Sequence, residues 1–193
     1  MKRTFPLGRI VLFWSIALGG AAFDLTTKAV VFSKLGDPHL SRPLSIIGNV
    51  LEFRTSHNPG ALWGFGRDWP YSSLVFAGLS GLAALAICYW LFIKGGAADA
   101  KLTVALALIM AGALGNCYDR VVYGHVRDFV HFHVDSINFN FAIFNFADNM
   151  LVAGAIILML LALRPESGES LDNRPAEGSA QLPPIGSESV STL

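Results

Sequence analysis

The stretch YSSLVFAGLSGLAALAICYWLFI, residues 71–93, carries no charged side chain. It is long enough to cross the apolar core of a bilayer, which takes about 20 residues of α-helix. Three further apolar stretches approximately meet this length, at residues 10–32, 102–118 and 144–163. Because 53% of the 193 residues are hydrophobic and only 15% are charged, the chain has too little charge to cover a soluble globule. We therefore predict an all-α membrane protein with four transmembrane helices.

Basic residues indicate the direction in which these helices cross the membrane. They lie at the N-terminus, between the second and third apolar stretches, and after the fourth: Lys2, Arg3, Arg9, Lys94, Lys101 and Arg164. Cytoplasmic segments next to membrane spans are enriched in Lys and Arg, so we place both termini in the cytoplasm. A cleaved signal peptide is the alternative for the first stretch. Its removal would leave three spans and force one basic segment out of the cytoplasm.

The two long connections should then lie on the outer side of the membrane. Residues 33–69 contain β-type segments such as IIGNVLEF broken by Gly, Pro and Asn, which predicts a small extracytoplasmic β-rich cradle. Residues 129–142 alternate polar and apolar side chains, as expected of a half-buried hairpin. We assign residues 1–165 to one membrane domain. Residues 166–193, rich in Ser, Glu, Gly and Pro, should form a disordered cytoplasmic tail.

Charge and cysteine content argue against two other classes of protein. Acidic and basic residues balance at 14 each, and no basic block is present, so we expect no nucleic-acid partner. Cys88 and Cys117 fall in different apolar stretches. If both stretches span, the two thiols lie near opposite faces of the membrane, beyond the reach of a disulfide.

Ionisable side chains at membrane depth are costly unless they are paired or hydrated, so they mark functional candidates. Six ionisable residues lie near the outer ends of the apolar stretches: Asp24, Lys28, Asp119, Arg120, Asp128 and Asp148. Asp24 and Lys28 are four residues apart on one helix face, which favours a salt bridge. For Asp119 and Arg120 we favour a structural role, with Asp119 bound to Arg120 or to backbone donors.

Asp128 and Asp148 both belong to the outer face. Two carboxylates that meet at a partly dry interface tend to share one proton. That is the arrangement of an aspartic protease, in which the ionised member activates water and the protonated member supports the oxyanion. From the spacing alone, a proton relay and a structural carboxylate pair stay open as alternatives.

Four segments resemble, in order, the motifs of the bacterial lipoprotein signal peptidases, also called signal peptidase II. They are FDLTTK at residues 23–28, HNPGALWG at 57–64, GALGNCYDRVVYGHVRDF at 112–129 and FNFADN at 144–149. The resemblance covers residues 10–163 and leaves the tail unmatched. Leu25 and Trp63 depart from the usual residues of the family, which puts details of substrate contact in doubt.

The resemblance implies a membrane-embedded aspartic endopeptidase with Asp128 and Asp148 as its catalytic pair. The other family positions that would bind substrate or support the site are Asp24, Lys28, Asn58, Gly60, Gly112, Asn116, Asp119, Arg120 and Asn145. On physical grounds Asn58 can donate to a substrate carbonyl, and Asn145 can orient Asp148 from the same helix face. Gly60 and Gly112 would permit close backbone approach.

The same resemblance implies the substrate and the location. The enzyme would remove signal peptides from prolipoproteins, cutting before a diacylglyceryl-modified cysteine, in the bacterial inner membrane. The acyl chains and the membrane lipids would hold the scissile bond at the depth of the aspartates. We expect a monomer that needs no cofactor or metal, with its β-rich cradle covering the site.

Two other motifs and one other class of protein compete with this interpretation. GLSG at residues 78–81 resembles a serine-protease motif, but none of the four spans contains a histidine to activate the serine. His131 and His133 could be two metal ligands on a strand, with His125 nearby, yet the HExxH motif is missing and a hydrated hairpin face explains them equally well. The rival class is a non-enzymatic four-span transporter or assembly subunit that uses its buried aspartates as a proton relay.

Overall fold

The computed structural model describes residues 7–61, 65–95 and 99–163. The predicted tail and Trp63 lie outside these residues. Most of the described chain is helical, as α1 Leu7–Leu35, α2 Ser72–Cys88 with the π-helical turn η2 Tyr89–Ile93, α3 Ala100–Tyr123 and α4 Phe146–Ala162. Among the described residues, three helices are long and apolar enough to cross a membrane, while α4 is a shorter apolar helix of 17 residues. The predicted class, a helical membrane protein with a small sheet, is confirmed.

Helix α3 is longer than its apolar pattern predicts. It starts after Asp99, whose side chain accepts hydrogen bonds from the backbone of Lys101 and Leu102, and it continues beyond residue 118 to Tyr123. Gly124, at φ 74°, adopts the left-handed conformation that ends the helix. The pattern suggested an earlier end because Asp119 and Arg120 are charged, yet both are buried.

The strands form one antiparallel sheet with the order β1-β2-β3-β4. Their bounds are β1 Leu44–Ile47, β2 Leu51–Asn58, β3 Val126–Val134 and β4 Phe139–Asn140. Two segments far apart in the sequence therefore meet, because β2 pairs with β3. Strand β3 starts before residue 129, where the sequence pattern placed the hairpin, so Asp128 lies on a strand.

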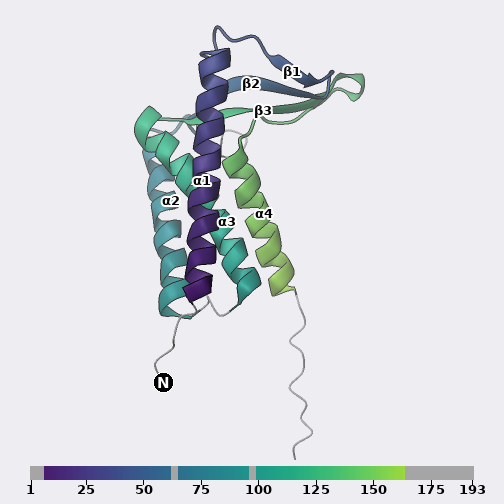
Figure 1. Ribbon diagram of the computed structural model, residues 1–193. Coiled ribbons are helices and arrows are strands. Elements are labelled where there is room, and N and C mark those ends of the chain that lie inside the picture. Colours follow the sequence, from purple (N-terminus) through teal and green to yellow (C-terminus); the bar gives the residue numbers. More distant parts are fainter. Residues whose placement is uncertain (1–6, 62–64, 96–98, 164–193) are drawn as a thin grey trace, which may run out of the picture. The chain divides into compact units, whose positions relative to one another are not determined.

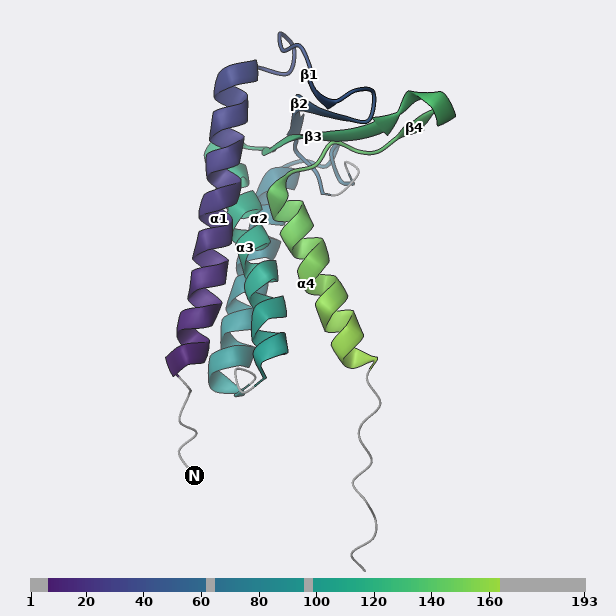
Figure 2. The same ribbon diagram turned by 45° about the vertical axis from the view of Figure 1, so that its right-hand side comes forward.

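Helix α3 lies at the centre of the bundle and packs against α1, α2 and α4 (Figure 1). An apolar cluster joins α1, α2, η2 and α3: Phe13, Ala17, Ile87, Leu91, Ala107 and Met110. At the far end of α1, Val31 packs with Phe129 and Val130 of β3. Figures 1 and 2 both show the sheet at the end of the bundle where α1 ends and α4 begins.

Candidate active site

Asp128 and Asp148 come from two different kinds of element. Asp128 lies on β3, where it pairs with Ser56 of β2, and only 2% of its surface is exposed. Asp148 lies in the first turn of α4, which Asn145 caps. Asp148 N donates to the Asn145 side chain at 3.0 Å, and Asn145 N donates to Asp148 Oδ2 at 3.1 Å. This capping box positions Asp148 with the same bonds that start the helix.

Two asparagine side chains connect the two carboxylates. Asn145 Nδ2 donates to Asp128 Oδ1 at 2.6 Å and to Asn116 Oδ1 at 3.2 Å. Asn116 Nδ2 donates to Asp148 Oδ1 at 2.8 Å. The structure therefore brings the two predicted aspartates into one hydrogen-bonded group, and the predicted supports Asn116 and Asn145 lie between them.

The environment of Asp128 favours its protonated form. Burial, and next the charge of the nearby Asp148 carboxylate, raise the pKa of Asp128 to about 7. Hydrogen bonds from Asn145 and Asn58 act in the opposite direction. Asp128 therefore holds a proton at pH values where an ordinary aspartate is ionised, as a shared proton requires.

Asn58 contacts the carboxylate of Asp128 at the end of β2. Its Nδ2 donates to Asp128 Oδ2 at 3.1 Å, and its Oδ1 accepts from Gly60 N at 3.0 Å. The carbonyl of Gly60 in turn accepts from Arg120 Nη2 at 2.9 Å. In this structure the amide of Asn58 thus orients a carboxylate, where the sequence suggested a bond to a substrate carbonyl.

A charge cluster is hydrogen-bonded to Asn116 and consists of Asp24, Lys28, Asp119 and Arg127. Lys28 Nζ is 2.8 Å from Asp24 Oδ2 and 3.2 Å from Asp119 Oδ2, and it donates to Asn116 Oδ1 at 2.9 Å. Arg127 Nη2 and Nε donate to Asp119 Oδ1 at 2.8 and 3.1 Å. Asp24, Lys28 and Asp119 are fully buried. Two acids and two bases balance, and Asn116 connects the cluster to Asp148.

The salt bridge predicted between Asp24 and Lys28 is present. Of the two partners expected for Asp119, the backbone donor is present, since Arg127 N donates to Asp119 Oδ2 at 3.0 Å, whereas the described residues show no salt bridge between Asp119 and Arg120. Consecutive residues of a helix do not face each other. Asp119 turns to Lys28 and Arg127, whereas the Arg120 guanidinium lies over the ring of Phe76 at 5.5 Å.

Sequence reasoning missed Arg127. A charge next to Asp128 on an alternating strand gave a weak signal, since charged strand residues are normally exposed, and Arg127 is only 8% exposed.

Two glycines of α3 let the neighbouring elements approach closely. A Cβ on Gly112 would collide with the carbonyl oxygen of Ala147 in α4. A Cβ on Gly115 would collide with Asp24 Oδ2. Ala147 N also donates to Asp24 Oδ1 at 2.8 Å. Gly112 was a predicted support, whereas Gly115 was missed because glycines of helix interfaces look alike in sequence.

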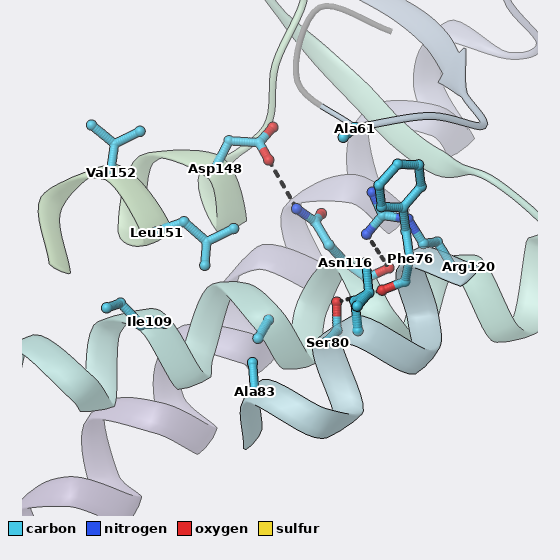
Figure 3. Close-up of a pocket in the computed structure, with 12 residues that line it drawn as sticks. Ala61, Phe76, Ser80, Ala83, Ile109, Asn116, Arg120, Asp148, Leu151 and Val152 are labelled. Atoms are coloured by element: carbon cyan, nitrogen blue, oxygen red, sulfur yellow. Dashed lines mark hydrogen bonds between the residues drawn. The ribbon is translucent and has the colours of Figure 1, made fainter. Parts of the chain in front are cut away.

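A cavity of about 330 Å³ opens beside Asp148, between α2, α3 and α4 (Figure 3). Its walls are mainly apolar: Phe76, Leu79, Ala83, Ile109, Leu151 and Val152. Its polar end is formed by Asp148, Asn116 and Arg120. An apolar chain bound in the cavity would therefore place a polar bond next to a carboxylate.

Comparison with known proteins identifies the family. The profile of the family described as Signal peptidase (SPase) II matches residues 16–164. The chain is 36% identical to a lipoprotein signal peptidase of Rhodopirellula baltica, over 81% of this chain and 73% of that protein. It is 34% identical to the lipoprotein signal peptidase of Bacillus subtilis, over 79% of this chain and 94% of that protein.

The fold comparison gives the same result. The solved structure of a bacterial membrane enzyme at 1.9 Å superposes with a TM-score of 0.69 and 29% identity, over 86% of this chain and 99% of that structure. A second such structure, at 2.3 Å, gives a TM-score of 0.70 and 30% identity, over 80% of this chain and 88% of the other. The resemblance drawn from the four motifs is confirmed: the chain belongs to the signal peptidase II family of aspartic peptidases and is a multi-span membrane enzyme with lipoprotein signal peptidase function.

Proposed function

We propose that Asp128 and Asp148 are the catalytic pair and that they hydrolyse the peptide bond before a diacylglyceryl-modified cysteine of prolipoproteins. The observation that carries the proposal is the bridge of Asn145 and Asn116 between two carboxylates, one of which has a pKa of about 7. A pair in which one member holds a proton and the other is ionised is the state that aspartic proteolysis needs.

In the proposed reaction Asp148 is the ionised member and Asp128 the protonated one. Asp148 takes a proton from a water molecule whose oxygen attacks the scissile carbonyl carbon, while Asp128 gives its proton to the carbonyl oxygen. The resulting diol collapses when the amide nitrogen takes the proton from Asp148 and the carbon–nitrogen bond breaks. As this bond breaks, Asp128 recovers a proton from a hydroxyl group of the diol. The products are a carboxylic acid and an amine, and the aspartate pair returns to its starting state.

The cavity between α2, α3 and α4 supports the choice of substrate. Its side walls carry Phe76, Leu79 and Leu151, so an apolar segment of signal peptide fits there better than a polar one. The acyl chains of the modified cysteine remain in the lipid, which holds the scissile bond at the level of Asp148.

We propose the inner-membrane orientation that the basic residues indicate. Both termini face the cytoplasm, as do Lys94 and Lys101. The sheet and the two aspartates face outward. Residues 1–165 carry the peptidase, and we propose that it works as a monomer, because Asn116 and Asn145 complete the connection between the two aspartates without a residue from a second chain.

Cleavage of a diacylglyceryl-modified prolipoprotein by the purified chain in detergent tests the catalytic pair. We expect D128N and D148N each to lower the rate of cleavage by at least about 1,000-fold, because removal of a group that takes part in proton transfer costs about that much. D99N is the matched control: an asparagine side chain can still cap α3 at this position, so the rate should equal that of wild type. Normal cleavage by a folded D128N or D148N variant would refute the pair.

A further inference from the structure

Three side chains that commonly bind metals gather on the sheet. Glu52 of β2 pairs with His131 of β3, and His133 follows on the same face of the strand. Ligand atoms of all three residues lie within 4.8 Å of one another. The two imidazole rings stack, with their centroids 5.0 Å apart. This group plays no part in the proposed proteolysis.

An oxygen on the outer side of each histidine fixes the orientation of its ring. His131 Nε2 lies 2.8 Å from Asn140 Oδ1, and His133 Nδ1 lies 2.9 Å from Asp135 Oδ1. Both oxygens are acceptors, so these nitrogens carry the hydrogens. Metal-binding histidines are held in the same way, by an oxygen that accepts from the ring nitrogen away from the metal.

The other two ring nitrogens converge on the carboxylate of Glu52. His131 Nδ1 lies 2.8 Å from Glu52 Oε1, and His133 Nε2 lies 3.7 Å from Glu52 Oε2. The second distance is too long for a hydrogen bond. His133 Nε2 is buried and has no hydrogen-bond partner among the described residues.

We propose that Glu52, His131 and His133 bind a Zn²⁺ ion. Two imidazole nitrogens and one carboxylate oxygen, with water as the fourth ligand, are an established zinc set. Ligand distances of about 2.1 Å in a tetrahedron place neighbouring ligand atoms about 3.4 Å apart. The three ligand atoms lie within 4.8 Å of one another, and each imidazole nitrogen lies near one oxygen of Glu52, at 2.8 and 3.7 Å, so side-chain shifts of about 1 Å complete the site.

Zinc explains this group better than hydrogen bonds alone do. His131 Nδ1 lies within hydrogen-bond distance of Glu52 Oε1, but His133 Nε2 is buried and too far from Glu52 Oε2 for a hydrogen bond. One divalent ion binds both nitrogens. It also balances the negative charges of Glu52 and Asp135, which face the two rings.

The bound ion fastens the sheet near the catalytic pair. It joins β2 to β3, and the bond between His131 and Asn140 extends the connection to β4. Asp128 lies three residues before His131 on the same strand. Because the ion binds residues that only the folded chain brings together, zinc should raise the unfolding temperature of the chain.

Calorimetric titration of the untagged full chain with Zn²⁺ in detergent, and the absorption spectrum with Co²⁺, test the proposal. We expect one ion per chain. E52Q and H133Q should each weaken binding by more than about 100-fold, and D135N by about 10-fold, because outer partners matter less than ligands. H39Q, which changes an exposed histidine outside the group, should bind as wild type does. Zn²⁺ should raise the unfolding temperature of wild type and H39Q but not of E52Q.

Two outcomes would overturn the zinc site. One is the absence of Zn²⁺ binding by folded wild-type chain; the other is equal binding by wild type, E52Q and H133Q, as would occur if Cys88 or Cys117 held the ion. If E52Q fails to fold, zinc binding by H133Q and the effect of zinc on the unfolding temperature of wild type test the proposal instead. D128N should bind zinc normally, which separates this test from that of the peptidase.

Discussion

The apolar cluster and the charge cluster are both buried in the helix bundle, but different forces hold them. In the apolar cluster, Phe13 of α1 meets the ring of Phe92 of η2 edge to face at 5.6 Å. In the charge cluster, Lys28 of the same helix α1 binds two carboxylates and one amide. Phe13 and Lys28 are equally inaccessible, each at 0% exposure.

This contrast indicates which region positions the active site. Lipid is as apolar as a leucine side chain, so helices gain little by burying apolar surface against one another in a membrane. Apolar packing tolerates small shifts, whereas charged hydrogen bonds have a defined length and direction. Through Asn116 the charge cluster reaches the carboxylate of Asp148 on α4, and through Asn116 and Asn145 it reaches that of Asp128 on β3. Activity should therefore depend on the charge cluster and stability on both.

Removal of Lys28 should have the largest effect. In K28M the carboxylates of Asp24 and Asp119 lose their shared cation, and breaking a buried pair in this way costs about 3–5 kcal/mol. We expect a lower unfolding temperature in detergent and, because Asn116 also loses a partner, a loss of cleavage of at least about 100-fold. K34M is the control, since Lys34 is exposed in the last turn of the same helix. Equal stability and activity of the two variants would refute the role of the cluster.

Gly112→Ala should show how a change of geometry alone, with every charge kept, affects the rate of cleavage. The new methyl group would press on the carbonyl of Ala147 and push the first turn of α4, which carries Asp148. A displacement of about 1 Å can cost about 100-fold in rate, so cleavage should fall by about 10- to 100-fold with the charges intact. G78A adds a methyl group to α2 at a point where no atom of another described element lies within 4 Å, and it should retain full activity. A fully active G112A would show that this close approach does not position Asp148.

The pH profile should report the proton on Asp128. Because the pKa of Asp128 is raised to about 7, kcat/KM should fall by about tenfold per unit as the pH rises above about 7.

The same proton affects stability. The folded state binds it more tightly than an unfolded chain with the ordinary pKa of 3.8, so its contribution is complete below about pH 4 and is lost as the pH rises through 7. D128N should remove this part of the pH dependence from the unfolding temperature, whereas D99N should keep it. An unchanged dependence in D128N would contradict the assignment.

The apolar pattern predicted the helices well because bilayer thickness imposes a minimum length. It could not predict that α3 continues through Asp119 and Arg120, since Asp119 binds Lys28 and Arg120 binds Gly60, both distant in sequence. The two β-type regions were each predicted, but the pairing of β2 with β3, and hence the location of Asp128 on a strand, depends on contacts across about 70 residues.

Prediction of the candidate site depended on the family resemblance more than prediction of the fold did. Spacing alone left Asp128 and Asp148 as a relay, a structural pair or a catalytic pair, and the four motifs favoured the last. Arg127 and Gly115 lie within the third motif but were not singled out there, although Arg127 belongs to the charge cluster and Gly115 adjoins Asp24. The zinc ligands illustrate how far sequence alternation alone can predict a site. Alternation put His131 and His133 on one face, but only the strand register adds Glu52.

Met110→Ala should have the smallest effect on activity and so complete the comparison of the two clusters. Met110 is 1% exposed within the apolar cluster, and its truncation leaves a cavity between helices. Because the unfolded helices remain in an apolar medium, the loss should be near the low end for such changes, about 1–2 kcal/mol. Cleavage at a temperature where the variant is folded should remain within about twofold of wild type.

L85A is the control, because Leu85 lies on the exposed face of α2, and this variant should lose less than about 0.5 kcal/mol of stability. A folded M110A with greatly reduced cleavage would show that apolar packing also positions the aspartates, and the division between the two clusters would then be wrong.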